Sequence, residues 1–216
     1  MKKILAVLLA VMILFALVGC ANSDQTDHKE EETKEETVEE NTKESETVED
    51  GNEEKSDTLI VYFSWSNNTE TMANYIHEQV GGDIERIVPV DAYPDNYNET
   101  ADLAKAQQDN DERPQFEALA YDPTTYDTVF IGYPIWWYSL PMIMETFFDT
   151  YDFTGITIIP FNTHEGSKDG GTYEMIRERE PGATVLEGLA IRGGNIYDDS
   201  SRQAVIDWLN GLSLNR

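Results

Sequence analysis

Hydroxyl and amide side chains are concentrated in one short stretch, Ser64-Trp65-Ser66-Asn67-Asn68-Thr69. It follows an apolar, β-branched run over residues 58–63, which predicts a buried strand, and it precedes helical spacing of apolar residues over 70–80. A tight strand-to-helix turn exposes unpaired backbone N–H groups at a helix N-terminus, where the helix dipole favours an anion. The stretch therefore predicts a phosphate cradle that works without a lysine. The alternative is a helix-capping cluster, in which Asn68 or Thr69 caps the helix.

Strands and helices alternate around and after this turn. Strands are predicted over residues 58–63, 84–90, 127–134, 156–161 and 184–191, and helices over 70–80, 99–109, 141–150, 170–180 and 200–209. Most strands are continuous apolar runs, which is typical of a sheet covered on both faces. Right-handed crossovers then give an α/β fold with a doubly wound parallel sheet. The role of residues 91–122 stays open.

Three loops should converge at one edge of this sheet, because ligands bind beyond the carboxyl ends of parallel strands. They follow the first, third and fourth strands, at residues 64–69, 134–140 and 162–171. The second loop carries adjacent tryptophans, and the third is small, polar and rich in glycine. Together they predict a pocket for a flat, phosphorylated heterocycle, since aromatic rings stack on flat conjugated systems. Core packing is the alternative for the tryptophans, and we expect at least one of them to face the ligand.

Three motifs resemble those of the flavodoxin-like family over about residues 58–212, in particular its members that are exported as bacterial lipoproteins. The motifs are Ser64-Trp65-Ser66-Asn67-Asn68-Thr69-Glu70-Thr71, Gly132-Tyr133-Pro134-Ile135-Trp136-Trp137 and Phe161-Asn162-Thr163-His164-Glu165-Gly166-Ser167. The resemblance implies a five-stranded parallel sheet of order 2-1-3-4-5 that binds FMN non-covalently.

The resemblance also implies a role for each matched residue. The phosphate would be held by the side chains of Ser64, Ser66, Asn68 and Thr69 and by the backbone N–H of Asn67. The isoalloxazine ring would be flanked by Pro134, Ile135, Trp136 and Trp137. Its other side and its pyrimidine edge would be lined by Thr163, Glu165, Gly166 and Ser167.

Two positions depart from the family pattern. Flavodoxins usually carry glycine at the position of Asn67, but asparagine tolerates a left-handed backbone, so we expect the turn to be kept. The third loop lacks the tyrosine that often stacks on the outer flavin face, and His164 is either its substitute or a surface histidine without a role. These departures favour the relatives that include quinone and FMN reductases over the electron-carrier flavodoxins.

Residues 1–20 predict export. Lys2 and Lys3 precede an apolar run that is too short for a typical membrane span and ends at Gly19 and Cys20. Leu17-Val18-Gly19-Cys20 resembles the lipobox of bacterial lipoproteins, in which the cysteine is lipidated; the alternative is an ordinary cleaved signal. Cys20 is the only cysteine of the chain, so the exported domain has no disulfide to form. We expect a lipid anchor on the outer side of the bacterial cell membrane.

Charge is spread unevenly over the rest of the chain. Residues 21–57 hold 16 acidic residues, 4 lysines and no aromatic residue, which predicts a disordered, extended tether; binding of basic partners or cations is the alternative. The domain over residues 58–216 holds 26 acidic and 9 basic residues, so nucleic acid is excluded as a partner. An acidic surface would instead suit a basic redox partner.

The sequence supports two functional hypotheses. The first is a membrane-tethered FMN protein that moves electrons, as a carrier or as a reductase of a small acceptor such as a quinone. The second is a flavin-free binding module at the cell envelope that retains the fold. No nucleophile–base pair or His/Cys metal motif is visible, so we predict no catalytic side chain and no metal site. Whether the protein is an FMN-dependent oxidoreductase stays open.

Overall fold

The computed structural model describes residues 56–212. The predictions of a signal peptide, of lipidation at Cys20 and of a tether therefore lie outside the described residues, apart from the last two tether positions. Within the described part of the chain, no helix combines the length and the apolar content that crossing a membrane requires.

The centre of the domain is a parallel sheet. Its strands are β1 (Thr58–Tyr62), β2 (Asp83–Arg86), β3 (Thr128–Pro134), β4 (Thr157–His164), β5 (Thr184–Val185) and β6 (Leu189–Arg192). The strand order is β2-β1-β3-β4-β5, and β6 also pairs with β4. All pairings are parallel. The predicted order 2-1-3-4-5 is confirmed, with β5 and β6 sharing the fifth position.

Two predicted strands are longer than the strands in the structure. The strand expected over residues 184–191 is interrupted between β5 and β6. Gly188 lies in this gap, where a side-chain carbon would come within 2.5 Å of the Pro160 carbonyl and of the Tyr173 ring. The strand expected over residues 84–90 ends at Arg86. Beyond it Val88 and Val90 are exposed, and their backbones bond residues 115–117 instead of β1.

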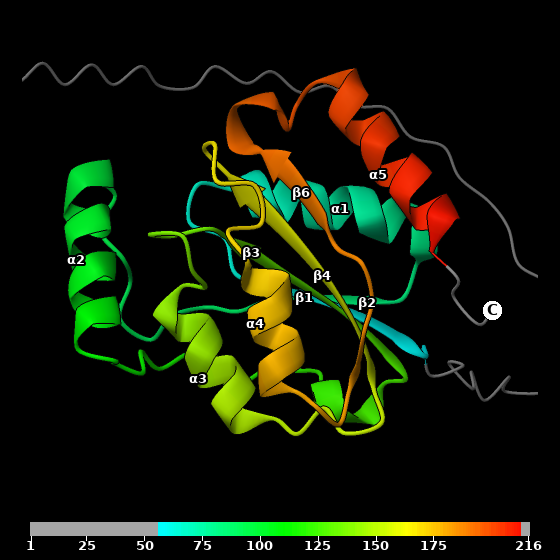
Figure 1. Cartoon of the computed structure of the whole chain (residues 1–216), viewed down its shortest axis with the longest axis horizontal. Coiled ribbons are helices and arrows are strands. Elements are labelled where there is room, and N and C mark those ends of the chain that lie inside the picture. Colours follow the sequence, from blue (N-terminus) through cyan, green and yellow to red (C-terminus); the bar gives the residue numbers. More distant parts are fainter. Residues whose placement is uncertain (1–55, 213–216) are drawn as a thin grey trace, which may run out of the picture. The chain divides into compact units, whose positions relative to one another are not determined.

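Helices cover both faces of the sheet (Figure 1). On one face, α1 (Asn68–Val80) and α5 (Asp199–Gly211) pack over β-strand residues such as Ile60 and Ile159. On the other face, α3 (Met142–Thr150) and α4 (Thr172–Arg179) pack over Val61 and Ile158. Successive strand side chains thus enter opposite apolar cores, as the continuous apolar runs predicted.

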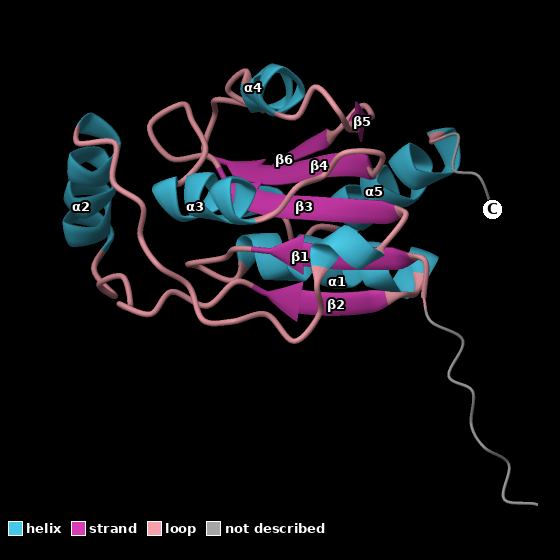
Figure 2. Cartoon of the chain, turned by 90° about the horizontal axis from the view of Figure 1, so that it is seen from below, coloured by secondary structure: helices cyan, strands magenta, loops and turns pink. Residues whose placement is uncertain are grey.

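Helix α2 (Tyr97–Asp109) belongs to neither layer. It stands beyond the carboxyl ends of the strands, at one end of the molecule (Figure 2). Asn96 caps it, because its side-chain oxygen accepts from the backbone N–H groups of Asn98 and Glu99. Its buried residues are Thr100, Ala104 and Gln107, which make no apolar stripe. The prediction of a helix over 99–109 is confirmed, with a start two residues earlier.

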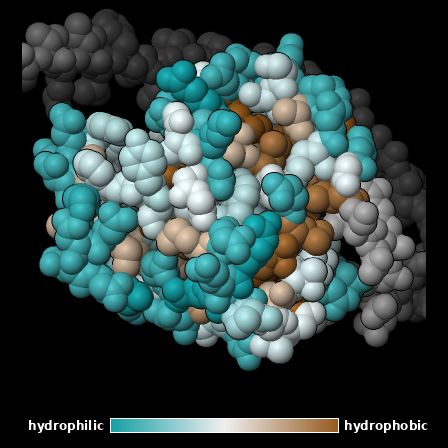
Figure 3. All heavy atoms as spheres, viewed as in Figure 1, coloured by the Kyte–Doolittle hydropathy of each residue, from teal (hydrophilic) through white to brown (hydrophobic). Residues whose placement is uncertain are grey.

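The surface also reflects this arrangement. Hydrophilic residues cover the region of α2, whereas hydrophobic residues reach the surface between α4 and α5, where β6 lies (Figure 3). Leu186 and Leu189 are partly buried hydrophobic residues at that sheet edge.

Candidate functional site

The strand-to-helix turn (Ser64–Asn67) joins β1 to α1. Ser64 is buried, and among residues 56–212 its Oγ is the buried side-chain polar atom that has no hydrogen-bond partner. Asn67 has φ 66 and ψ 1, the left-handed conformation that asparagine tolerates, so the turn is kept as predicted. The first helical bond runs from the Thr71 N–H to the Asn67 carbonyl, at 2.9 Å. The N–H groups of residues 68–70 precede that bond and are available at the helix N-terminus.

Helix capping does not explain the polar residues of this turn. The residue at the N-cap position is Asn67, and its side chain makes no capping bond, so the alternative with Asn68 or Thr69 as the cap is wrong. The Thr69 hydroxyl instead lies 2.8 Å from the Thr163 hydroxyl on β4, and both are buried. One hydroxyl of such a pair donates to the other, and the acceptor keeps its own hydrogen for a further partner.

The guanidinium of Arg86 contacts the strand-to-helix turn. Arg86 at the end of β2 donates from Nη2 to the Ser64 carbonyl at 2.5 Å and from Nη1 to Glu70 Oε2 at 3.3 Å. Burial raises the pKa of Tyr62 to about 12, and the Glu70 charge adds to the rise. The Tyr62 hydroxyl therefore stays protonated and donates to Glu70 at 3.3 Å. These contacts tie the turn to β2, and the Arg86 guanidinium is shared between the Ser64 carbonyl and the Glu70 carboxylate.

The aromatic turn (Trp136–Ser139) follows β3. Two backbone bonds between Trp136 and Ser139, at 3.1 and 3.0 Å, close a two-residue hairpin. Its central residues, Trp137 and Tyr138, have φ values of 49° and 61°, so the turn is of type I′. Glycine and asparagine usually occupy these positions, and bulky residues there carry backbone strain of about 1–3 kcal/mol each. Such strain is common where a turn serves a binding site.

The two adjacent tryptophans have different surroundings. Trp136 is half-buried and meets the rings of Phe63 and Tyr93 edge-on, at 5.4 and 5.0 Å between centroids. Trp137 is 48% exposed, and its indole Nε1 donates to the Ala101 carbonyl of α2 at 2.9 Å. Trp136 thus anchors the turn to the core, while Trp137 connects it to α2.

The polar loop (Glu165–Gly171) follows β4, which extends to His164 and therefore includes residues predicted as loop. Asn162 is fully buried; its Nδ2 donates to the Lys168 carbonyl at 3.1 Å, and its Oδ1 accepts from the Tyr173 hydroxyl at 2.6 Å. The backbone N–H of Gly166 donates to Nδ1 of His164 at 2.8 Å. Asn162 and His164 of β4 thus hold the loop at Lys168 and Gly166.

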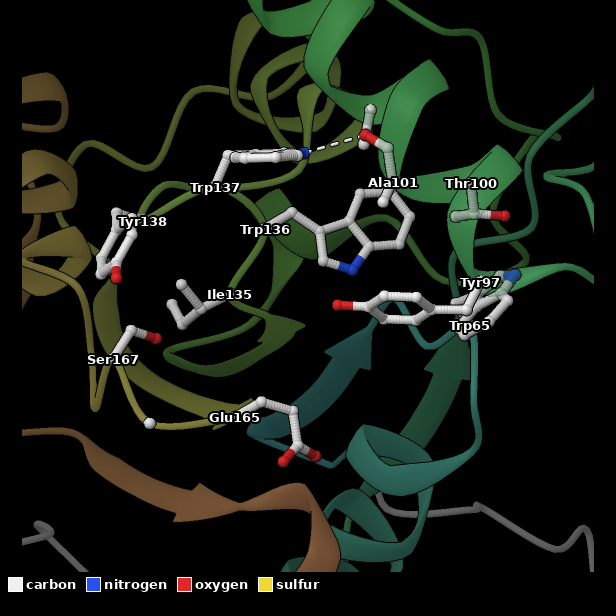
Figure 4. A pocket seen from close by; sticks show the side chains of 12 residues that line it. Trp65, Tyr97, Thr100, Ala101, Ile135, Trp136, Trp137, Tyr138, Glu165 and Ser167 are labelled. Atoms are coloured by element: carbon white, nitrogen blue, oxygen red, sulfur yellow. Dashed lines mark hydrogen bonds between the residues drawn. The ribbon is translucent and has the colours of Figure 1, made fainter.

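A cavity of about 440 Å³ opens where these loops meet α2 (Figure 4). Figure 4 shows the Tyr97 hydroxyl directed toward its interior, whereas the Glu165 carboxylate lies at the edge of the cavity and points away from the aromatic rings. Glu165 is the only charged residue of the lining, and Arg192 Nε lies 3.5 Å from its Oε2. The cavity is lined by Trp65, Tyr97, Thr100, Ala101, Ala104, Ile135, Trp136, Trp137, Tyr138, Glu165, Gly166 and Ser167.

The strand-to-helix turn adjoins this cavity. Trp65 belongs to the turn and lines the cavity, and its Nε1 donates to the Pro94 carbonyl ahead of α2 at 2.9 Å. Asn68 and Glu165 meet at Gly193, where a side-chain carbon would lie 2.6 Å from Asn68 Nδ2 and 2.7 Å from Glu165 Oε1. The predicted convergence of the three loops is therefore present in the structure.

Residues 57–212 match the model of the flavodoxin family. The chain belongs to the flavodoxin family. Among solved structures it is similar to candidate flavoproteins from Bacteroides eggerthii and Bacteroides uniformis. Both are 28% identical with a TM-score of 0.63, and the matches cover 73% and 72% of this chain and 98% of each of those chains. A flavoprotein from Lactobacillus acidophilus in complex with FMN is 26% identical, with a TM-score of 0.56 and coverage of 70% and 99%. Among curated proteins, no sequence matches this chain.

In this flavodoxin domain the predicted residues divide into two groups. Those that line the cavity are Ile135, Trp136, Trp137, Glu165, Gly166 and Ser167. Those that lie outside its lining are Ser64, Ser66, Asn67, Asn68, Thr69, Pro134 and Thr163. Pro134 is the last residue of β3. The Thr163 hydroxyl forms a hydrogen bond with the Thr69 hydroxyl. The second group otherwise belongs to the adjoining turn and the start of α1.

Sequence reasoning missed one wall of the cavity. Trp65 and Tyr138 also line the cavity without having been predicted, but they neighbour predicted residues in the sequence. The missed wall comes from α2 and includes Tyr97 and Ala101. The sequence of α2 could have indicated this position by what it lacks. A helix of 13 residues without an apolar stripe cannot pack on a sheet face. Among residues 56–212 no group of three or more metal-ligating side chains is present.

Proposed function

We propose that this domain binds FMN and moves electrons. The observation that carries the proposal is the Ser64 hydroxyl, which is buried without a partner at a turn where several backbone N–H groups are also available. A buried unpaired hydroxyl destabilises a protein unless a ligand completes its hydrogen bonding. A phosphate supplies the acceptors that such donors lack. The solved flavoprotein from Lactobacillus acidophilus, which is in complex with FMN, supports the choice of ligand.

The protein's own groups then have separable roles. We assign the phosphate to the hydroxyls of Ser64 and Ser66, with Arg86 contributing positive charge from below. The backbone N–H groups at the start of α1 and the side chains of Asn68 and Thr69 complete this part of the site. We assign the ring to the cavity, between the apolar surfaces of Ile135 and Trp136 on one side and the polar loop on the other.

Bound FMN can transfer single electrons or a hydride, and this chemistry belongs to the cofactor. The chain controls access and charge around it. The domain over residues 58–216 holds 26 acidic and 9 basic residues, so added negative charge on the ring is disfavoured. We therefore expect a midpoint potential below that of free FMN.

We further propose that the protein acts as an electron carrier or as a reductase of a small acceptor such as a quinone. The exposed Trp137, Tyr138 and Tyr97 at the cavity support access by a flat acceptor. The excess of acidic residues supports steering of a basic redox partner. Lipidation of Cys20 and the acidic segment 21–57 would tether the domain to the outer side of the cell membrane.

Flavin titration tests the proposal. The 216-residue chain is mixed with FMN, and binding is followed by quenching of flavin fluorescence and by visible absorbance bands. We expect binding by the wild type, weaker binding by Trp136→Ala, and wild-type binding by the control Trp208→Ala, since Trp208 lies on α5 and bonds Glu187. No binding by the wild type would refute the proposal, and equal affinity of all three proteins would refute the placement of the ring.

A further inference from the structure

His164 occupies the last position of β4, directly before the polar loop. Its ring nitrogen Nδ1 accepts the backbone N–H of Gly166 at 2.8 Å. This bond spans two residues and closes a small turn over Glu165, in the same way that an asparagine side chain closes an Asx turn. The two residues after His164, together with Ser167, line the cavity. The imidazole therefore sets the path of the backbone at one wall of the site.

The bond requires one protonation state of the ring. An N–H donor needs a lone pair on Nδ1, so the imidazole is neutral with its hydrogen on Nε2. Protonation would place a hydrogen on Nδ1, facing the Gly166 N–H, and the bond would be lost. Gly166 has φ 130, a conformation that glycine adopts readily, so its backbone can move when the bond is broken.

Charges of both signs surround the ring. Glu165 and Asp169 of the polar loop favour the protonated form, whereas Lys168 and Arg192, from the loop and from β6, oppose it. Burial outweighs these charges and lowers the pKa of His164 below its ordinary value. The neutral form is therefore the resting state at neutral pH, in agreement with the hydrogen bond.

We propose that His164 is a positioning residue that holds Glu165–Ser167 in the ligand-binding conformation, and that its protonation releases this segment. The effect on ligand affinity rests on the proposed function, because the ligand in question is FMN. The effect on the loop itself does not. Binding to the released loop is weaker, so the affinity falls as the pH drops through the pKa of His164.

The loop is tested first without ligand. In a ¹⁵N-labelled 216-residue chain, the amide resonance of Gly166 should titrate between pH 8 and pH 5 with the same midpoint as the His164 ring. In His164→Asn the amide oxygen replaces Nδ1 as a non-titrating acceptor, so the Gly166 resonance should stay constant. A Gly166 resonance that does not respond in the wild type, or one that titrates with the same midpoint in His164→Asn, would overturn the proposal.

FMN affinity is tested second, at pH 8 and at pH 5. The wild-type dissociation constant should rise more than that of His164→Asn, by up to tenfold for each pH unit below the midpoint. The phosphate of FMN titrates equally in both measurements and cancels in the comparison. His164→Ala should bind about threefold to tenfold more weakly at pH 8, from the loss of one hydrogen bond. His77→Asn should behave as the wild type.

These arms separate the two proposals. A wild-type chain that binds no FMN refutes the proposed function, while the Gly166 titration still decides the role of His164. A wild type and His164→Asn that lose affinity equally between pH 8 and pH 5 refute the role of His164 in ligand binding, with FMN binding intact.

Discussion

The strand-to-helix turn and the aromatic turn follow neighbouring strands at the same sheet edge, yet they are built differently. Each includes residues with left-handed backbone, at Asn67 in the first and at Trp137 and Tyr138 in the second. The first turn is tied to the sheet at its start, where Ser64 is buried and its carbonyl accepts from Arg86 of β2, and Thr69, just after the turn, pairs with Thr163 of β4. Ser66 and Asn67 are exposed. The second projects toward solvent, and its central side chains are exposed.

Under the proposed function, the two turns contact two different parts of the ligand. An anion is held by many donors at fixed positions, so its turn is tied to the sheet on several sides. A flat ring is held by apolar contact, which tolerates a strained turn and a helix outside the two layers. The connection from Trp137 to Ala101 joins that turn to α2 by a single hydrogen bond. We expect the strand-to-helix turn to be the rigid part and the wall made by α2 to be the adaptable part.

The largest effect should distinguish the two adjacent tryptophans. Trp136→Ala removes a half-buried ring from contact with Phe63 and Tyr93 and should lower the free energy of unfolding by about 2–4 kcal/mol. Trp137→Ala loses one exposed indole hydrogen bond and should cost no more than about 1 kcal/mol. Urea denaturation of both variants measures the difference. Equal losses would show that the aromatic turn is anchored as firmly at its tip as at its base.

The sheet and the meeting of its loops could be predicted from sequence, whereas α2 could not be placed. Apolar runs such as residues 128–133 identify central strands, and parallel topology then brings their following loops together. For α2, helical periodicity indicates a helix, but burial of only Thr100, Ala104 and Gln107 leaves its position undetermined. The bond from Trp137 to Ala101 depends on that position. The break in the fifth strand depends on local crowding at Gly188, which periodicity does not report.

The next effect concerns the buried hydroxyl of Ser64 in the strand-to-helix turn. Its removal should raise the free energy of unfolding and lower the affinity for FMN. Ser64→Ala removes an unpaired buried group and should raise the unfolding free energy of the ligand-free protein by about 1 kcal/mol. The same change should weaken FMN binding about tenfold, because a hydrogen bond to a charged phosphate is lost. Denaturation and flavin titration measure the two values. Ser139→Ala in the aromatic turn is the control, and a loss of both stability and affinity in Ser64→Ala would contradict the assignment.

An effect of similar size compares the backbone of both turns directly. At Asn67 and at Trp137, alanine should be less stable than glycine at the same position by about 1–2 kcal/mol, because alanine is strained in the left-handed region. Each alanine–glycine pair cancels the loss of the original side chain. The differences in unfolding free energy should be similar at the two sites. A difference near zero at Trp137 alone would mean that the aromatic turn relaxes to another conformation, which would strengthen the contrast between a rigid and an adaptable turn.

The smallest effect concerns the attachment of the segment that follows α2. Arg113 donates from Nε to Asp149 of α3 at 2.6 Å, and this bond, with a further contribution from Arg179, lowers the pKa of Asp149. Because the folded-state pKa lies below the unfolded value, the stabilisation is complete above about pH 4. It is lost as the pH falls through the folded-state pKa.

The Asp149 side chain is 49% exposed, so solvent screening limits the contribution to less than about 1 kcal/mol. Asp149→Asn should therefore lower the unfolding free energy slightly at pH 7, and its difference from the wild type should shrink toward zero as the pH falls below about 4. Asp102→Asn, on the exposed side of α2, is the control. A difference that persists in acid would mean that Asp149 stabilises α3 by packing or by neutral hydrogen bonds. The wall formed by α2 would then be held without the ion pair at Arg113.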